Sequence, residues 1–203
     1  KVHQGSVLAA LPQDFNFVGE KSELIIGNNN VIRENVVINR ATHRGCKTVI
    51  GSDNFLMEGA HISHDTVVGD RCVFGYGAKI AGDCVIDTGA VISSNVVEKA
   101  NTRVGSYAVV QAGTTFSRDV PPYIIAGGSP VGFHGVNTTI QKSAGVEEKT
   151  LKHIANAYRL LFYGQTSVFD ACIQIEQQVP SSTEISNIID FVRGTEVGII
   201  SKL

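Results

Sequence analysis

The sequence has no tryptophan, little charge of either sign and no long apolar run. Charged residues make up 18% of the 203 residues, and the formal net charge is −2. A strongly basic nucleic-acid-binding protein is therefore not expected. The apolar residues are scattered among glycine, asparagine, aspartate and serine, and they never form the run of about 20 that a membrane span requires. We expect neither a nucleic-acid partner nor a membrane span.

The four cysteines lack the spacing of a disulfide framework or a zinc knuckle. Cys46, Cys72, Cys84 and Cys172 contain no CxxC pair, which favours a reducing compartment, so we expect a cytoplasmic protein. No GxxxxGK motif and no dinucleotide-binding fingerprint occurs. The glycines are therefore interpreted as turn residues.

A six-residue repeat runs through the first half of the chain. An apolar residue recurs at every sixth position from Ile26 to Phe116, and only Arg44 and Glu98 interrupt it. This period matches neither the 3.6 residues of a helical turn nor the alternation of a long strand. It favours a short strand followed by a turn. Three such units close a triangular coil, so that residues 18 apart stack at the spacing of paired strands, about 4.8 Å.

The repeat predicts a parallel β-helix over residues 1–137, because an antiparallel sandwich would not hold one phase for so long. Residues 41–48, around Arg44, are expected to leave the prism as a loop. A charge is costly in a dry core, so the coil that contains Glu98 is expected to be distorted.

The character of the sequence changes after Asp119, where prolines and glycines replace the repeat. Helical spacing of apolar residues predicts helices over 146–163, from a cap at Thr166 or Ser167 through 179, and over 182–192. Residues 138–203 are therefore predicted to form a C-terminal helical domain that covers a coil edge or a neighbouring subunit.

The most informative polar residue is His64, which the phase of the repeat turns outward. The residue 18 positions further on is Gly82, so the imidazole should lie beside a peptide N–H that no side chain obstructs. A general base next to such a donor is typical of acyl transfer, and Asp65 could hold the imidazole tautomer. An exposed histidine on a solenoid face is an equally good interpretation from spacing alone.

A zinc site is the alternative that the histidine spacing leaves open. His43 and His61 are also 18 apart, and stacked histidines hold zinc in trimeric β-helix carbonic anhydrases. No third histidine shares their phase, so we favour the general base and expect no metal. Asp14, before the clear repeat, reads as a surface turn.

The repeat resembles that of the hexapeptide-repeat acyltransferases, whose prism is a left-handed parallel β-helix. Further segments resemble those of the acyl-[acyl carrier protein]–UDP-N-acetylglucosamine O-acyltransferase family, which begins lipid A synthesis in Gram-negative bacteria. They are Gln13-Asp14, Ile32-Arg33-Glu34, Ile38-Asn39-Arg40, residues 49–54, residues 60–65, residues 119–123 and Asn156-Ala157-Tyr158. Members of this family usually have further coils before this point, so Lys1 is expected to be an internal start.

The resemblance implies a role for each matching position. It makes His64 the base that deprotonates the glucosamine 3-hydroxyl, with Asp65 beside it, and makes the Gly82 N–H the oxyanion donor. The substrate-binding positions that it implies are Gln13 and Asp14 at the sugar, His61 at the nucleotide sugar and Asn137 at the uridine end. Ala112 would limit the depth of the acyl groove, which favours a medium-to-long 3-hydroxyacyl chain.

The resemblance also implies the partners. The acyl chain would arrive on the phosphopantetheine of acyl carrier protein, so no further cofactor is expected. The other substrate would be UDP-N-acetylglucosamine, and the active sites would lie between the subunits of a homotrimer.

This chain departs from the family pattern at several basic or histidine positions, which here are Asn16, Asp83, Lys99 and Ser143-Ala144. We expect other cations to hold the phosphates and the phosphopantetheine and to meet the acidic carrier protein. The candidates are Lys79, Lys99, Arg103 and Lys142.

Two other functions compete with O-acyl transfer. One is the related N-acyltransferase of a later acylation step, and the other is a non-catalytic β-helix scaffold. A scaffold has no reason to place His64 opposite Gly82.

Overall fold

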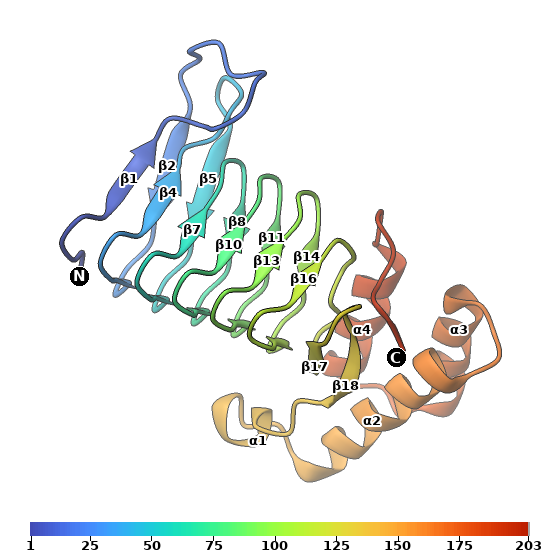
Figure 1. Ribbon diagram of the computed structural model, residues 1–203. Helices are drawn as coiled ribbons and strands as arrows, with labels where there is room; N and C mark the ends of the chain where they lie inside the picture. Colours follow the sequence, from blue (N-terminus) through green and yellow to red (C-terminus); the bar gives the residue numbers. More distant parts are fainter. Residues whose placement is uncertain (203) are drawn as a thin grey trace.

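The structure is a computed structural model that describes residues 1–202; Leu203, the last residue of the expected helical domain, lies outside the described residues. Short strands stack into a three-sided prism that begins near the N-terminus, and helices lie at its other end (Figure 1). The prism positions the candidate site, because each coil fixes the place of the side chains on its outer surface.

Two of the three faces of the prism are purely parallel sheets. The six-stranded sheet consists of β1 (Val7–Ala10), β4 (Val37–Asn39), β7 (His61–Ile62), β10 (Lys79–Ile80), β13 (Val97–Glu98) and β16 (Thr115–Phe116). The five-stranded sheet consists of β2 (Glu23–Ile26), β5 (Lys47–Ile50), β8 (Val67–Val68), β11 (Val85–Ile86) and β14 (Arg103–Val104).

The third face is an eight-stranded sheet that reaches into the C-terminal region. Its strands are β3 (Val31–Ile32), β6 (Phe55–Leu56), β9 (Val73–Phe74), β12 (Val91–Ile92), β15 (Val109–Val110), β17 (Ile124–Gly127), β18 (Gly132–Val136) and β19 (Ser201–Lys202). β18 is antiparallel to β17 and parallel to β19. The C-terminal strand β19 thus joins the sheet that continues from the third face of the prism.

Three rows of turns form the corners of the prism. The first corner leads from the six-stranded to the five-stranded sheet and includes residues 63–66, 81–84 and 99–102. The second corner leads from the five-stranded to the eight-stranded sheet and includes residues 51–54, 69–72, 87–90 and 105–108. The third corner leads back to the six-stranded sheet and includes residues 33–36, 57–60, 75–78, 93–96 and 111–114.

The repeat stacks as predicted from Ile50 onward. Ile50 pairs with Val68 and Ile62 pairs with Ile80, both 18 residues later. The apolar position of each unit is buried inside the prism, with an exposed fraction of 0–2% from Ile50 to Phe116. Burial of this continuous column stabilises every coil through its neighbours.

Two earlier coils are longer, and here the expectation that residues 18 apart stack is wrong. Ile38 pairs with Ile62, 24 residues later, and Leu8 pairs with Ile38, 30 residues later. The extra residues form the loops 11–22 and 41–46, which project beyond the prism on the side of the first corner (Figure 1). The predicted loop around Arg44 is therefore confirmed. Its insertion has the length of one repeat, so the phase of the sequence does not reveal it.

The coil that contains Glu98 is regular, which corrects the expected distortion. Val97 and Glu98 pair in register with β10 and β16, and Glu98 points into the core with 1% of its surface exposed. Its Oε1 accepts a hydrogen bond of 3.0 Å from the Thr102 hydroxyl, while Oε2 has no partner among the described residues. Burial raises the pKa of Glu98 well above its usual range. The core thus holds a neutral carboxylic acid rather than a charge.

Three C-terminal helices confirm the sequence prediction: α2 (Glu148–Tyr163), α3 (Val168–Gln178) and α4 (Thr183–Arg193). A short fourth helix, α1 (Ile140–Ser143), is not among the expected helices. The N-cap hydroxyls of Ser167 and Ser182 accept hydrogen bonds from the backbone N–H groups of Asp170 and Ile185, as capping requires. Among residues 1–202, no helix has the length and apolarity needed to cross a membrane.

A buried ion pair and a tyrosine join these helices to the prism. Asp119 is 1% exposed and accepts hydrogen bonds from the backbone N–H and the Nε of Arg103 at 2.8 and 2.9 Å. The Arg103 guanidinium also donates to the Phe191 carbonyl of α4 and covers the Phe191 ring. The Tyr158 hydroxyl of α2 donates to the Pro122 carbonyl. Nε and Nη2 of Arg103 are therefore used within the chain, which weighs against its expected role in holding substrate phosphates.

The neutral state of Glu98 predicts a pH dependence of stability. The carboxyl of the unfolded chain ionises near its usual pKa, whereas the folded protein keeps the proton on Glu98. Stability therefore falls as the pH rises from the unfolded pKa toward the raised folded pKa. Glu98→Gln, which mimics the protonated acid, removes this loss. We expect the free energy of unfolding of the variant, relative to the unchanged protein, to rise in urea titrations as the pH increases above the usual carboxyl pKa. A difference that stays constant with pH would contradict a buried neutral Glu98.

Candidate active site

The imidazole of His64 lies at the first corner, in the turn that follows β7. Its Nδ1 is 2.9 Å from Asp65 Oδ2. The same carboxylate oxygen accepts a hydrogen bond of 2.9 Å from the Thr42 N–H, so it acts as an acceptor and the proton of the neutral ring lies on Nδ1. Nε2 is left with a free lone pair. The ring is thereby held in the tautomer that a general base needs.

Asp65 is placed by both its backbone and the loop next to it. Its φ is +57°, in the left-handed region that asparagine and aspartate tolerate better than most residues. Its N–H donates to the Thr48 hydroxyl at 2.9 Å. Thr42 lies in the inserted loop 41–46 and Thr48 lies in β5, just after it, so this insertion supports the carboxylate that orients His64. Neither threonine can be singled out from the sequence, because their contacts depend on the 24-residue coil.

The long loop 11–22 brings Asp14 to the other side of the imidazole. Asp14 Oδ2 lies 3.5 Å from His64 Nε2, while Oδ1 accepts a hydrogen bond of 2.6 Å from the Asn16 N–H. Only 10% of the His64 side chain is exposed, so the solenoid-surface interpretation of this residue is wrong. Gln13 is exposed beside Asp14. The two carboxylates face opposite ring nitrogens and would both stabilise a positive charge on the ring.

Gly82 lies directly against the His64 ring. A Cβ atom built on Gly82 would be 2.3 Å from Cε1 and 2.6 Å from Nε2 of His64, so any other residue would displace the imidazole. The Gly82 N–H donates to no acceptor among residues 1–202. The expected pair of an imidazole and an unobstructed peptide N–H is therefore present in a single chain.

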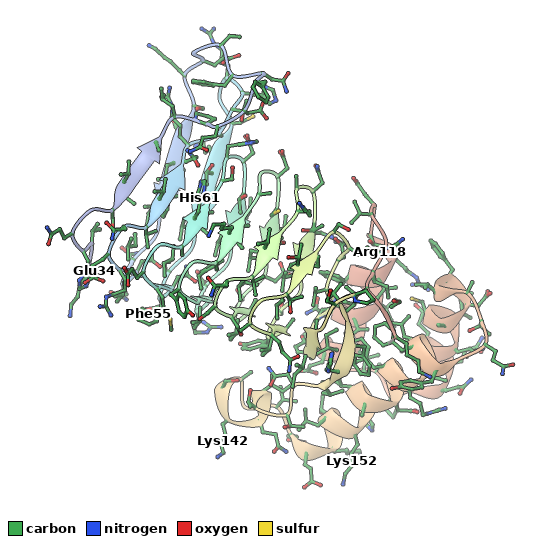
Figure 2. All side chains as sticks on the ribbon, in the orientation of Figure 1. Glu34, Phe55, His61, Arg118, Lys142 and Lys152 are labelled. Carbon is green, nitrogen blue, oxygen red and sulfur yellow. The ribbon has the colours of Figure 1, made fainter. Side chains whose placement is uncertain are left out.

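His61 lies on the outer face of the six-stranded sheet (Figure 2). Its Nε2 is 2.6 Å from Asn39 Oδ1, and Asn39 Nδ2 donates to the Leu11 carbonyl. The amide oxygen of Asn39 must therefore accept the hydrogen bond, which leaves His61 Nδ1 as a free acceptor. Burial lowers the pKa of His61, and the Lys79 ammonium lowers it further.

The stacked-histidine hypothesis is corrected by the strand register. His61 pairs with Val37 and Lys79 rather than with His43, because the inserted loop shifts the register by one repeat. Among the described residues, no cluster of three or more histidine, cysteine or acidic side chains is arranged to hold a metal ion.

Asp83 follows Gly82 at the position where the resemblance implies a histidine. Burial raises the pKa of its carboxyl, and the nearby Asp65 carboxylate raises it further. Lys99, in the next coil of the same corner, is exposed. The first corner therefore carries Asp83 and a lysine where the family pattern has histidines.

Asn137 follows β18 and contacts the second corner at Tyr107, away from His64. It lines a surface cleft of about 260 Å³ together with Arg71, Tyr107, Thr139 and Ser143. Its Nδ2 donates to the Tyr107 carbonyl, and its Oδ1 accepts from the hydroxyl and the N–H of Thr139. The Arg71 guanidinium donates to the Tyr107 hydroxyl at 3.2 Å. Arg71 is thus a cation of this cleft that the sequence analysis missed, because its relation to Asn137 depends on the tertiary fold.

The two remaining candidates lie elsewhere. Lys142 is exposed on α1, beyond the end of the prism (Figure 2). Ala112 is exposed at the third corner, the row of turns that also contains the labelled Glu34. One chain therefore brings Asp14, His64, Asp65 and Gly82 together, whereas Asn137 lies beside the second corner and Ala112 at the third.

The contact between Asn39 and His61 predicts that a substitution of Asn39 changes the pKa of His61. Asn39→Asp places a carboxylate against His61 Nε2, which favours the charged imidazole, so we expect the pKa of His61 to rise. An NMR titration of the histidine ring protons measures this shift. Asn137→Asp, at a buried asparagine beside the second corner, is the matched control and should leave the His61 titration unchanged. An unchanged His61 titration in Asn39→Asp would contradict the contact.

Two protein-family models match the chain. The model described as UDP N-acetylglucosamine O-acyltransferase, domain 2, matches residues 119–200, and the bacterial transferase hexapeptide model of six repeats matches residues 47–82. The first match covers the end of the prism and the helices, and the second covers the coils that carry His64 and Gly82.

Curated relatives carry one name. The acyl-[acyl-carrier-protein]–UDP-N-acetylglucosamine O-acyltransferase of Syntrophobacter fumaroxidans is 38% identical over 191 residues, which cover 93% of this chain and 74% of the relative. The protein of the same name from Xylella fastidiosa is 35% identical over 183 residues, which cover 89% of this chain and 70% of the relative.

Solved structures of similar proteins have the same fold. A UDP-N-acetylglucosamine acyltransferase from Bacteroides fragilis is 44% identical with a TM-score of 0.95, and the match covers 98% of this chain and 78% of that chain. The enzyme from Francisella novicida is 26% identical with a TM-score of 0.91, and the match covers 99% of this chain and 75% of that chain. The prism is thus a left-handed parallel β-helix, as expected, and the chain belongs to the acyl-[acyl-carrier-protein]–UDP-N-acetylglucosamine O-acyltransferase family.

Proposed function

We propose that this protein transfers a 3-hydroxyacyl chain from acyl carrier protein to the glucosamine 3-hydroxyl of UDP-N-acetylglucosamine, the first step of lipid A biosynthesis. One observation carries the proposal: His64 has its Nδ1 held by Asp65 and packs directly on Gly82. The names of the relatives favour this reaction over N-acyl transfer. A scaffold would need neither the oriented imidazole nor the space that Gly82 leaves for it.

His64 acts as the general base. Its free Nε2 takes the proton of the sugar hydroxyl while the hydroxyl oxygen attacks the thioester carbonyl carbon of the donor. The tetrahedral intermediate then collapses, the C–S bond breaks, and the proton on Nε2 passes to the departing thiolate of the phosphopantetheine. Ester and free thiol are formed, and the imidazole returns to its starting state.

The carboxylates stabilise the imidazolium that forms during this cycle. Asp65 lies 2.9 Å from Nδ1 and Asp14 lies 3.5 Å from Nε2. Asp14 lies beside Nε2, the nitrogen that receives the sugar proton in this mechanism, so it can also accept a hydrogen bond from a neighbouring sugar hydroxyl and orient the sugar. This second role agrees with the contact to the sugar that the resemblance implies.

Gly82 supplies the oxyanion donor. Its N–H has no acceptor among residues 1–202 and belongs to the residue on which the base packs. A peptide N–H fixed in this way stabilises the negative charge that develops on the thioester oxygen. No metal or prosthetic group enters these steps, because the acyl chain arrives already activated on the carrier protein.

The distribution of the candidate residues favours a homotrimer with active sites between subunits. Within one chain, His64, Asn137 and Ala112 lie at or beside three different corners of the prism. Side chains at different corners can meet only if the corner of one copy faces another corner of its neighbour. We infer that the uridine-binding cleft and the acyl groove are completed by neighbouring copies around one threefold axis.

The positive charge for the diphosphate and the carrier protein comes from exposed or cleft-lining cations. Arg71 lines the cleft beside Asn137 and Ser143, where the resemblance implies a basic pair that this chain lacks. His61 and Lys79 lie in register on the outer face of the six-stranded sheet. Lys99 and Lys142 are exposed and remain candidates for the phosphopantetheine and the acidic carrier protein.

Loss of the base tests the mechanism. His64→Ala should lower kcat by about 10²- to 10⁴-fold, the usual contribution of a general base. The variant should fold normally, because His64 lies at a corner rather than in the core. His134→Ala, at an exposed histidine of β18, is the control and should keep full activity. Acyl-UDP-sugar formation is followed by mass spectrometry, and a fully active His64→Ala protein would rule out this role.

Ala112 tests the proposed acyl groove. Ala112→Met should fill the end of the groove, and lost burial of about 0.8 kcal/mol per CH₂ penalises long donors more than short ones. Ala112→Gly should shift the preference in the opposite direction. The measurement is a competition between carrier proteins loaded with chains of different length. An unchanged ratio of long to short product in both variants would show that the groove ends elsewhere.

A further inference from the structure

Short polar side chains at the second corner occupy backbone N–H groups of the preceding coil. The Ser52 N–H donates to Asp70 Oδ1 at 2.7 Å, and the Asp70 N–H donates to the Thr88 hydroxyl at 3.3 Å. In each case the acceptor side chain lies 18 residues after the donor. A short acceptor at the same position of the next coil can therefore occupy a corner N–H, as Asp70 and Thr88 do. Among residues 1–202, Ser94 and Ser106 do not accept the N–H groups of Tyr76 and Thr88 in this way.

The equivalent positions at the first corner are His64, Gly82 and Ala100. The coils stack there in the same way, since the Asn101 N–H donates to the Gly82 carbonyl at 3.2 Å just as the Arg71 N–H donates to the Ser52 carbonyl at 2.9 Å. Ala100 thus occupies the place that Asp70 takes below Ser52. Its methyl group cannot accept a hydrogen bond, and the Gly82 N–H has no acceptor among the described residues.

We propose that Ala100 is a positioning residue that keeps the Gly82 N–H free for the oxyanion. The inference rests on the proposed function, because it assumes that this N–H stabilises the tetrahedral intermediate. A hydroxyl at position 100 would compete with the substrate for the donor. Loss of a single oxyanion donor costs about 10²- to 10³-fold in kcat, so one oxygen atom at an exposed corner residue has a large effect on the rate.

An isosteric pair of variants isolates that oxygen atom. Ala100→Thr introduces the same side chain that accepts the Asp70 N–H, and Ala100→Val has the same shape without the hydroxyl. We expect kcat of Ala100→Thr to be about 10²-fold below that of Ala100→Val, with similar KM values for UDP-N-acetylglucosamine. Ala100→Asp introduces the side chain that accepts the Ser52 N–H, and it is compared with the unchanged protein in case both β-branched variants fold poorly.

Amide hydrogen exchange at Gly82, measured on the same full-length assembled proteins, reports whether the N–H is occupied. Slower exchange in Ala100→Thr than in Ala100→Val, together with the lower kcat, would support the proposal. A lower kcat without slower exchange would overturn it, because the loss would not act through the N–H. Unchanged exchange with equal rates would also overturn it, because Ala100 would not control this donor.

One outcome separates this inference from the proposed function. If exchange slows in Ala100→Thr but its kcat equals that of Ala100→Val, the Gly82 N–H is not the oxyanion donor and the inference fails. Acyl transfer with His64 as base then still stands on the activity of the unchanged protein and its loss in His64→Ala. If the unchanged protein does not acylate UDP-N-acetylglucosamine, the proposed function itself fails.

Discussion

The parallel pairing of each short strand with the next coil is the interaction on which the rest of this structure depends. A strand of two residues is not stable alone, and it persists here because its neighbours above and below hydrogen-bond to it and bury the same column of apolar side chains. The register Ile62 to Ile80 also places the turn of His64 directly over that of Gly82. Strand pairing thus determines both the fold and the contact between the base and the peptide that it adjoins.

Periodicity in the sequence predicts the prism well, because every unit needs one apolar residue that points into the core. The inward residue, the contact of His64 with Gly82 and the C-terminal helices all follow from local spacing.

Periodicity fails at the insertion 41–46, whose length equals one repeat: the phase continues while the register shifts, so His43 and His61 do not stack. The support of Asp65 by Thr42 and the approach of Asp14 depend on loops whose paths no repeat encodes. Likewise, Arg103 looked available for phosphates because sequence does not show its buried partner Asp119.

The corners and the faces of the prism have different physical roles. The faces carry the strand pairing. The one carboxyl group that a described face strand turns into the core, that of Glu98, is neutral. The corners carry backbone groups that pairing leaves unused, including the Gly82 N–H, and so provide donors for chemistry without loss of a ladder hydrogen bond. Since the three corners are separate in one chain, a complete site is most simply formed where copies meet.

The left-handed backbone of Asp65 has a consequence for how such a site can arise. Asp53, Asp83, Asn95 and Asn101 adopt the same conformation in other turns of the prism, because short side chains with a carbonyl oxygen suit this region. The solenoid therefore displays a ladder of carboxyl and amide groups for conformational reasons alone. A histidine placed just before one of them has an orienting partner next to it. A catalytic turn can therefore arise in a different coil during evolution without a change in the rest of the prism.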